Sequence, residues 1–340
     1  MIELNEQEKN LLNGYKFVDL FCGIGGFHLA LKSFGASCVF ASDVNSSACK
    51  VYEENFHLKP QGDIRKIRCK DIPKHDILCA GFPCQPFSIS GNKKGFEDPN
   101  GKLFFEIIRI ARFHKPKMIL LENVKNLESH DNGNTLKKIQ DKLKKLGYRS
   151  FSRVLNATYY GVPQARKRIY IIAFKNNLKI KNFTFPEGNQ TMETWNCIKD
   201  ILENKDNNQY QISRQAVINE DIEKNIIKSD KLIRIGQIGL GRQGERIYSI
   251  KGQAITLSSQ GGGLGGKTGM YLINGVVRRL SPRECARLMG FPDDFILAKS
   301  EYDCYSQFGN SVVVNVIQEI IRTASKLVIK ENETNGKCKI

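Results

Sequence analysis

The chain has 340 residues, of which 41% are hydrophobic and ten are cysteine, and its formal net charge is +17. This length suits one or two domains with a substantial core. No apolar run reaches the roughly eighteen residues of a membrane-spanning helix, so we expect no membrane span. The first residues are acidic and polar, which argues against a secretory signal and for a cytoplasmic chain. The cysteines form no Cys-x-x-Cys pair, and we expect neither disulfides nor a metal site.

The first part of the chain alternates apolar runs with helical patterns. Gly23, Gly25 and Gly26 follow the first apolar run and precede a helical pattern that reaches Phe34. Strands alternating with helices predict βαβ units and a parallel sheet. The strands are expected over residues 16–21, 37–41, 76–80, 117–121 and 168–174, and further helices over 45–56, 103–113 and 134–146.

The alternation ends near residue 185. Residues 187–230 are rich in Asn, Asp, Gln and Lys, and the glycine-rich stretch that follows contains two strand-like pieces, 246–250 and 253–257. We therefore expect a smaller loop- and β-rich domain over 190–304. A helical pattern over 311–326 then returns to the first domain, which would comprise residues 1–189 and 305–340.

Basic residues are concentrated in this second region. Between Lys228 and Arg283, ten Lys or Arg stand against two Asp or Glu. A local excess of this kind is typical of a surface that contacts phosphates, and a generally basic, solvated surface is the alternative. The distribution indicates a polyanionic partner.

Cys84 stands in the most distinctive local sequence of the chain. It lies between Pro83 and Pro86, directly after a predicted buried strand. Each proline fixes its own φ and restricts the residue before it, so the backbone around the thiol is stiff. The other nine cysteines suit small buried positions. A thiol held stiffly at a strand end predicts a nucleophile.

The glycine-rich turn after the first strand predicts a ligand loop. Glycines there let a ligand approach the backbone at the carboxyl end of the sheet. His28 stands where a dinucleotide fingerprint would have its third glycine, which disfavours a nicotinamide oxidoreductase. Asp43 ends the second strand and suits ribose hydroxyls, while Asp63 and Ile64 are candidates for holding a base. The alternative is a structural turn with a surface aspartate.

A carboxylate and two arginines complete the candidate site. Glu122 follows the strand over 117–121, and Arg166 and Arg168 would point to one side if that segment is extended. Together with Cys84 they would converge on one cleft beside the glycine loop. Taken singly, Glu122 would be a surface carboxylate and the arginines a solvated basic run.

Six segments of the chain resemble the ordered motifs of DNA (cytosine-5) methyltransferases. They cover residues 17–315 in the order of that family: Asp19-Leu-Phe-Cys-Gly-Ile-Gly-Gly26, Gly81-Phe-Pro-Cys-Gln-Pro-Phe-Ser88, Glu122-Asn-Val124, Gln164-Ala-Arg-Lys-Arg168, Arg279–Pro292 and Gln307-Phe-Gly-Asn-Ser-Val312. The resemblance implies a doubly wound, mostly parallel sheet of the S-adenosylmethionine-dependent methyltransferase fold, with a smaller target-recognition domain. It also implies methyl transfer from S-adenosylmethionine to C5 of a cytosine flipped out of double-stranded DNA.

The resemblance also assigns roles to residues. Cys84 would add to cytosine C6, Glu122 would hold N3, and Arg168 would hold the O2 side and orient Glu122, with Arg166 close by. Val44 stands where the family commonly has a large apolar or aromatic side chain beside the cofactor. The cofactor contacts carried over from the family are Phe21, Gly23, Gly25, Asp43, Asp63, Ile64 and Asn310.

Residues 236–274 resemble the recognition segment of GCGC-specific members of the family. By that likeness Gln243 would fill the gap left by the flipped cytosine, Ser90 would approach from the catalytic loop, and Arg246 would contact guanine. A glycine-rich scaffold loop without base contacts is the alternative.

The resemblance further implies a monomeric bacterial enzyme that is associated with DNA in the cytoplasm. It would protect host DNA, in functional pairing with a restriction endonuclease. Two other functions stay open at this point: a tRNA cytosine-5 methyltransferase of the same family, and a catalytically silent relative that binds DNA.

Overall fold

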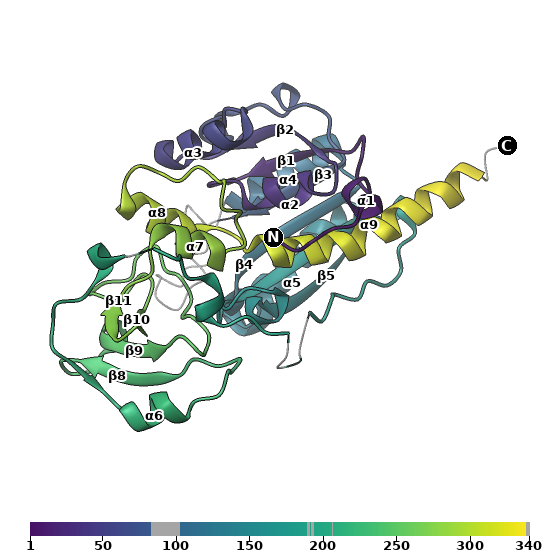
Figure 1. Cartoon of the computed structure of the whole chain (residues 1–340). Coiled ribbons are helices and arrows are strands. Elements are labelled where there is room, and N and C mark those ends of the chain that lie inside the picture. The colour runs from purple at the N-terminus through teal and green to yellow at the C-terminus, as the bar shows by residue number, and fades with distance from the viewer. Residues whose placement is uncertain (83–102, 189–190, 192–193, 206, 338–340) are drawn as a thin grey trace. The chain divides into compact units, whose positions relative to one another are not determined.

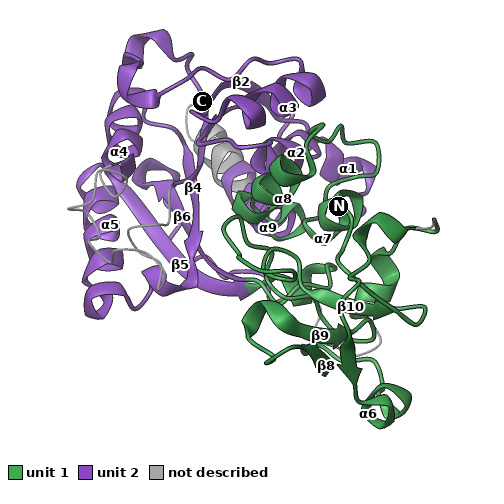
Figure 2. Ribbon diagram, turned by 90° about the vertical axis from the view of Figure 1, so that its left-hand side faces the viewer, with its two compact units in different colours: residues 1–2, 156–166, 187–316 green, residues 3–155, 167–186, 317–340 purple. Residues whose placement is uncertain are grey.

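The computed structural model describes residues 1–82, 103–188, 191, 194–205 and 207–337 (Figure 1). The chain divides into two compact units (Figure 2). Unit 1 comprises residues 1–2, 156–166 and 187–316, and unit 2 comprises residues 3–155, 167–186 and 317–340. Residues 156–166 and 305–316, which we expected in the first domain, belong to unit 1.

Unit 2 is built on a six-stranded sheet in the order β2-β1-β3-β4-β6-β5. β1 pairs in parallel with β2 and β3, and β3 in parallel with β4, whereas β4 and β6 are antiparallel, so the sheet is mixed. Its strands are β1 (Lys16–Leu20), β2 (Ser37–Ser42), β3 (Ile77–Gly81), β4 (Met118–Val124), β5 (Tyr148–Asn156) and β6 (Lys167–Lys175). The helices are α1 (Glu6–Lys9), α2 (Gly26–Lys32), α3 (Ser46–Phe56), α4 (Leu103–His114), α5 (Asn134–Lys145) and α9 (Val314–Lys337), which begins in unit 1.

The five strands predicted in this part of the chain are confirmed, and β5 is an addition to them. β5 reads Tyr-Arg-Ser-Phe-Ser-Arg-Val-Leu-Asn, and only two of its residues are buried. It lies at one end of the strand order, so it needs no continuous apolar run. The helix expected over 311–326 is present and extends further, to Lys337. No helix in the described part of the chain is long and apolar enough to span a bilayer.

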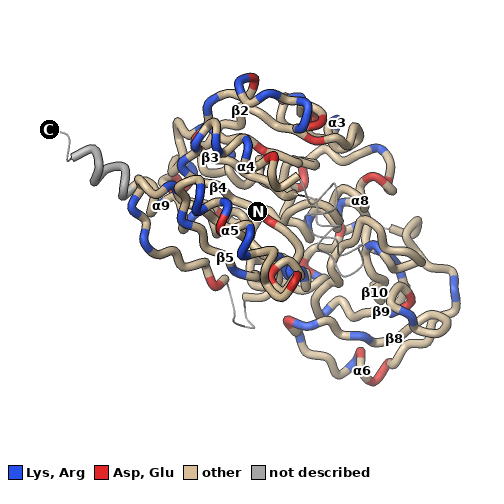
Figure 3. The backbone as a smooth tube through the Cα atoms, turned by 180° about the vertical axis from the view of Figure 1, so that it is seen from behind, with Lys and Arg blue, Asp and Glu red and all other residues tan. Residues whose placement is uncertain are grey.

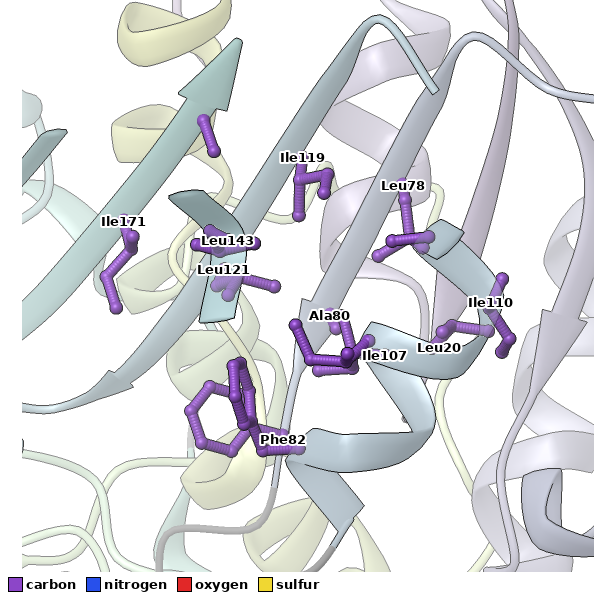
Figure 4. Close-up of a cluster of buried hydrophobic side chains, with 14 of the residues drawn as sticks. Leu20, Leu78, Ala80, Phe82, Ile107, Ile110, Ile119, Leu121, Leu143 and Ile171 are labelled. Atoms are coloured by element: carbon purple, nitrogen blue, oxygen red, sulfur yellow. The ribbon is translucent and has the colours of Figure 1, made fainter. Parts of the chain in front are cut away.

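One face of the large sheet packs against α4 and α5. Alternate residues of the strands, such as Leu78 and Ile119, form one buried cluster with Ile107 of α4 and Leu143 of α5 (Figure 4). Because strand side chains alternate, the intervening residues face the other way. This layer of apolar contacts holds the strand ends in fixed positions.

The other face carries α2 and a buried aromatic group. The ring of His28 in α2 lies 5.4 Å from the ring of Phe17 in β1, and its Nδ1 lies 2.7 Å from the Tyr52 hydroxyl of α3. Burial lowers the pKa of His28 to about 3, so the imidazole is neutral. The residue that interrupts the dinucleotide fingerprint is thus a packing residue.

Unit 1 contains a five-stranded sheet in the order β11-β10-β9-β8-β7. β9 and β10 are parallel and the other pairs are antiparallel. The strand expected over 246–250 is confirmed as β9, whereas 253–257 is wrong as a strand, since only Ala254 forms an isolated bridge, to Gln164. Its elements are β7 (Ala216–Ile218), α6 (Glu220–Asn225), β8 (Arg234–Ile238), β9 (Arg246–Ser249), β10 (Met270–Ile273), β11 (Val276–Arg278), α7 (Pro282–Leu288) and α8 (Glu301–Asn310).

A buried ion pair joins the last strand of unit 1 to α7. Glu284 is fully buried and accepts from Arg278 Nη1 at 2.8 Å and Nη2 at 2.7 Å. A third hydrogen bond, from the Ser281 backbone amide at 2.8 Å, closes the capping box of α7. The Glu284 carboxylate therefore has a structural role.

We expect Glu284→Gln to lower the free energy of unfolding by about 3–5 kcal/mol, because it leaves the Arg278 guanidinium buried without its counter-charge. Urea unfolding of the full chain measures the loss. Lys224→Gln is the matched control, since it removes a charge from an exposed pair with Glu220 and should cost about 1 kcal/mol or less. Equal stabilities of the two variants would contradict a structural role for the buried pair.

Candidate functional site

The candidate site residues of unit 2 lie along one edge of its sheet. β1, β2, β3 and β4 are mutually parallel through their pairings, so their carboxyl ends lie at the same edge. Phe21, Asp43 and Phe82 directly follow β1, β2 and β3 at this edge, and Glu122 lies near the end of β4. The topology thus brings together four positions that are spread over a hundred residues of sequence.

The glycine loop leaves an open backbone after β1. Phe21, Gly23 and Gly25 have φ values of 55°, 52° and 89°, the left-handed region that favours glycine. A Cβ on Gly25 would lie 2.2 Å from the Phe56 ring, so this glycine is required by packing. A Cβ on Gly23 would meet no atom within 4 Å. Space in front of Gly23 is therefore available to a ligand.

Asp43 ties this loop to the next one. Its Oδ2 accepts from the Gly23 amide at 2.8 Å and its Oδ1 from the Asn45 amide at 2.8 Å. Each carboxylate oxygen can accept a second hydrogen bond, so the group is held in place and still able to bind hydroxyls. Val44 beside it is 75% exposed. An exposed apolar side chain next to a fixed carboxylate suits a ligand with a polar and a flat apolar part.

Asp63 and Ile64 follow a segment that runs beside the end of β2. The Asp43 amide donates to Gln61 O at 3.0 Å, which keeps this segment next to Asp43. The Asp63 carboxylate is bound by Arg65 (Nη2 to Oδ2 2.6 Å), which lowers its pKa. Ile64 is buried, and its carbonyl oxygen accepts from Arg109 Nη2 at 2.9 Å.

Glu122 and Arg168 form an ion pair at the same edge. Arg168 Nε lies 3.2 Å from Glu122 Oε1, and both side chains are largely buried. The antiparallel register sets Tyr170 opposite Glu122, so Arg168, two residues away, lies diagonally across from the carboxylate. The predicted proximity of Glu122 and Arg168 is present in the structure.

The end of β3 lies next to this pair. Gly81 is the register partner of Glu122, and Asn123 Nδ2 donates to Phe82 O at 3.0 Å in a buried position. The sequence motif that contains Asn123 predicts no role for this residue. Its position next to the carboxylate at the end of the strand is the feature that could have indicated one. Cys84 and Ser90 lie outside the described residues.

Arg166 lies in unit 1 and is engaged there. Its guanidinium is buried and donates from Nη1 to Leu257 O at 3.1 Å and from Nη2 to Gly309 O and Ser311 O at 3.0 and 2.8 Å. Asn310, which is exposed, lies between the last two carbonyls. The two arginines have different partners, since Arg166 donates to main-chain carbonyl groups of unit 1 and Arg168 pairs with Glu122 of unit 2.

A cavity of about 420 Å³ in unit 1 contains the predicted base readers. Gln243 and Arg246 line it together with Thr256, Ser258 and several glycines. Arg246 Nε donates to Gly241 O at 3.4 Å. The basic residues between Lys228 and Arg283 all belong to this unit (Figure 3). Within the described ranges, no cluster of three or more His, Cys, Asp or Glu is arranged to hold a metal ion.

Known proteins with similar sequences are DNA methyltransferases. The family model for the C-5 cytosine-specific DNA methylase matches residues 15–326. The chain is 51% identical over 323 residues to the type II methyltransferase M.HhaI of Haemophilus parahaemolyticus, which covers 94% of this chain and 96% of that protein. It is 39% identical over 331 residues to M.HpaII of Haemophilus parainfluenzae, covering 92% of this chain and 90% of the relative.

Solved structures agree at the level of the fold. The Dnmt2 methyltransferase of Schizosaccharomyces pombe superimposes with a TM-score of 0.69 at 23% identity, covering 94% of this chain and 99% of that one. A putative DNA modification methyltransferase encoded within an Escherichia coli prophage gives 0.69 at 19% identity, covering 93% and 99%. With a family match across most of its length and a relative more than half identical, the chain belongs to the C-5 cytosine-specific DNA methylases, enzymes that depend on S-adenosylmethionine.

Proposed function

We propose that unit 2 binds S-adenosylmethionine and performs the chemistry, and that unit 1 is the target-recognition domain, which selects GCGC in double-stranded DNA. In this proposal the sheet of unit 2 is the doubly wound, mostly parallel sheet of the methyltransferase fold. The observation that carries it is the Glu122–Arg168 pair at the carboxyl edge, beside the strand end from which the chain runs toward Cys84.

The cofactor site fits the chemistry of S-adenosylmethionine. When bound, the cofactor supplies an electrophilic methyl group on a sulfonium. Gly23 and Gly25, with Phe21, would let it approach the backbone, and the fixed Asp43 carboxylate would accept from the ribose hydroxyls. The exposed Val44 would pack against the adenine, and Asp63 and Ile64 would complete the part of the site that belongs to unit 2.

Cys84 would start the reaction on the cytosine. Its thiolate adds to C6, which breaks the C5–C6 double bond and makes C5 nucleophilic enough to take a methyl group. Glu122 holds a proton at N3, so that negative charge does not build up on the ring. Loss of the C5 proton then lets the thiol leave and restores the double bond. The atoms involved are stacked inside a duplex, so the base must first be flipped out.

The two arginines would have different roles. Arg168 orients Glu122 through the ion pair and contacts the O2 side of the base. Arg166 acts as a positioning residue: by holding the carbonyls of Gly309 and Ser311 it fixes the backbone around Asn310.

Base reading would take place in the cavity of unit 1 and from the segment that contains Ser90. Gln243 would occupy the gap left by the flipped cytosine, and Arg246 would donate to guanine. Support for GCGC comes from the likeness of residues 236–274 to GCGC-specific family members. Since the relatives named above are type II methyltransferases, we also propose that the chain protects host DNA as a monomer in a bacterial cytoplasm, paired with a restriction endonuclease.

A covalent trap tests the chemistry. With S-adenosylmethionine, a GCGC duplex carrying 5-fluorocytosine should form an adduct that survives denaturation, because fluorine at C5 blocks the final elimination. Cys84→Ser should form no adduct while retaining DNA binding, and Cys69→Ser, the matched thiol control, should behave like the wild type. Failure of the wild-type chain to form an adduct on any cytosine duplex would refute the mechanism.

Gly23→Ala tests the cofactor site. The left-handed φ of 52° costs an alanine roughly 1–2 kcal/mol, and the new methyl group would occupy the space in front of the loop. We expect the Kd for S-adenosylmethionine, measured by calorimetry, to rise at least about tenfold, which corresponds to about 1.4 kcal/mol. Gly62→Ala, where a Cβ also meets nothing within 4 Å and φ is ordinary, should leave the Kd unchanged. An unchanged Kd in Gly23→Ala would exclude this loop from the cofactor site.

Arg246→Ala tests base reading. Loss of one bidentate contact to guanine should reduce discrimination between GCGC and single-substituted sites by about 1–3 kcal/mol. Bisulfite sequencing of DNA from cells that express wild type or variant reports the methylated sites directly. A variant that retains the wild-type site preference would remove Arg246 from the readers.

A further inference from the structure

A second cavity of unit 1 shares part of its glycine-rich lining with the base-reading cavity. Its volume is about 360 Å³, and its wall includes Gly263, Lys267, Arg279, Tyr302 and Tyr305. Gly261 lines both cavities. Nothing in the proposed chemistry uses this second cavity.

Each cation in this cavity lies over a tyrosine ring. Lys267 Nζ is 3.6 Å from the centroid of Tyr302, and Arg279 Cζ is 5.9 Å from the centroid of Tyr305. Tyr305 is buried, and its hydroxyl donates to Leu280 O at 2.9 Å, so that ring is fixed. Tyr302 is 68% exposed. The attraction of the ring face holds the ammonium in place, and because the group has three N–H donors it can still donate to an incoming acceptor.

The charge of the cavity suits an anion. Among the described residues neither Lys267 nor Arg279 forms an ion pair, and Arg279 Nε is buried without a hydrogen-bond partner. One carboxylate, Glu301, also lines the cavity, which leaves two cations against one anion. A guanidinium with an unused donor beside an oriented ammonium is an arrangement that binds phosphate oxygens.

We propose that this cavity holds a backbone phosphate of bound duplex DNA, with Lys267 and Arg279 as donors and Tyr302 as the residue that positions Lys267. The inference rests on the proposed role of unit 1 in DNA recognition. Because Gly261 lines both cavities, a duplex whose bases are read on one side of the loop has its own backbone near the other side. Phosphate contacts of this kind set position and contribute no sequence information.

The test is the salt dependence of DNA affinity. The Kd for a GCGC duplex and for a scrambled duplex is measured by fluorescence anisotropy over a range of KCl concentrations. Lys267→Gln should reduce the slope of log K against log salt by about 0.9, the value for one phosphate contact, and should weaken both duplexes by the same factor. Tyr302→Ala should act in the same direction, and Tyr302→Phe, which keeps the ring, should restore the wild-type slope. Lys224→Gln, which removes the same charge on α6, should leave the slope unchanged.

Other outcomes would overturn the proposal in recognisable ways. A Lys267→Gln slope equal to that of wild type would exclude a phosphate contact, and a loss confined to GCGC would make Lys267 a base reader instead. Titration with inorganic phosphate in the absence of DNA distinguishes a site for small anions from a site for DNA. If phosphate bound saturably and Lys267→Gln abolished that binding, while the salt slope of DNA affinity stayed unchanged, the cavity would be a site for free phosphate. Melting temperatures of the variants identify any loss of folding. The proposed recognition of GCGC is tested separately from the phosphate site, and it would be contradicted if the wild type showed no preference for GCGC.

Discussion

The hydrogen-bonding register of β4 with its two neighbours is the constraint on which the candidate site depends. Pairing with β3 sets Glu122 opposite Gly81, and pairing with β6 sets Val124 opposite Arg168. Because side chains alternate along a strand, Glu122 and Arg168 fall on one face, and a slip of one residue would turn one of them to the other face. The ion pair is therefore fixed by backbone pairing across three strands that are buried in the core. The long, flexible Arg168 side chain then only has to reach a carboxylate that already lies nearby.

The part of this edge that carries the glycine loop is held by a different interaction, in which a carboxylate accepts hydrogen bonds from backbone amides. Asp43 accepts from Gly23 and from Asn45, which joins the loop after β1 to the start of α3. A side chain with both oxygens already engaged cannot swing away when a ligand arrives, so little conformational entropy is lost on binding. Phe21, a non-glycine residue with a φ of 55°, is part of the same loop, and such backbone strain persists where surrounding contacts hold it. Both halves of the edge are thus held by contacts within the protein itself.

Sequence patterns predict the parts of this protein that depend on one local feature of the sequence, such as an apolar run. Buried strands such as 77–81 are unbroken apolar runs, and Glu122 could be placed at the sheet edge because its strand is one of them. The pattern does not predict β5 because its exposed positions carry arginine and two of its half-buried positions carry serine, and an edge strand needs apolar residues on little of its surface. Arg166 binds main-chain carbonyl groups that are distant in the sequence, at Leu257, Gly309 and Ser311, and no local pattern of side-chain polarity predicts such partners. The strand expected over 253–257 shows the converse, since apolar alternation with only one bridged residue, Ala254, leaves a loop.

The glycines of unit 1 allow two segments of backbone to approach closely because they carry no side chain. A Cβ on Gly261 would lie 1.8 Å from Gly266 O, and one on Gly266 would lie 1.9 Å from Gly262 O. Two passes of backbone are therefore in direct contact, and the loop is as thin as a polypeptide allows. Gln243 and Arg246 line one of the two cavities that share Gly261, and Lys267 lines the other. Any side chain at Gly261 or Gly266 would separate the two passes and move these groups apart. The distance between a base and a phosphate is fixed by the covalent geometry of DNA, so under the proposal above one duplex would occupy both cavities only if this loop stays thin.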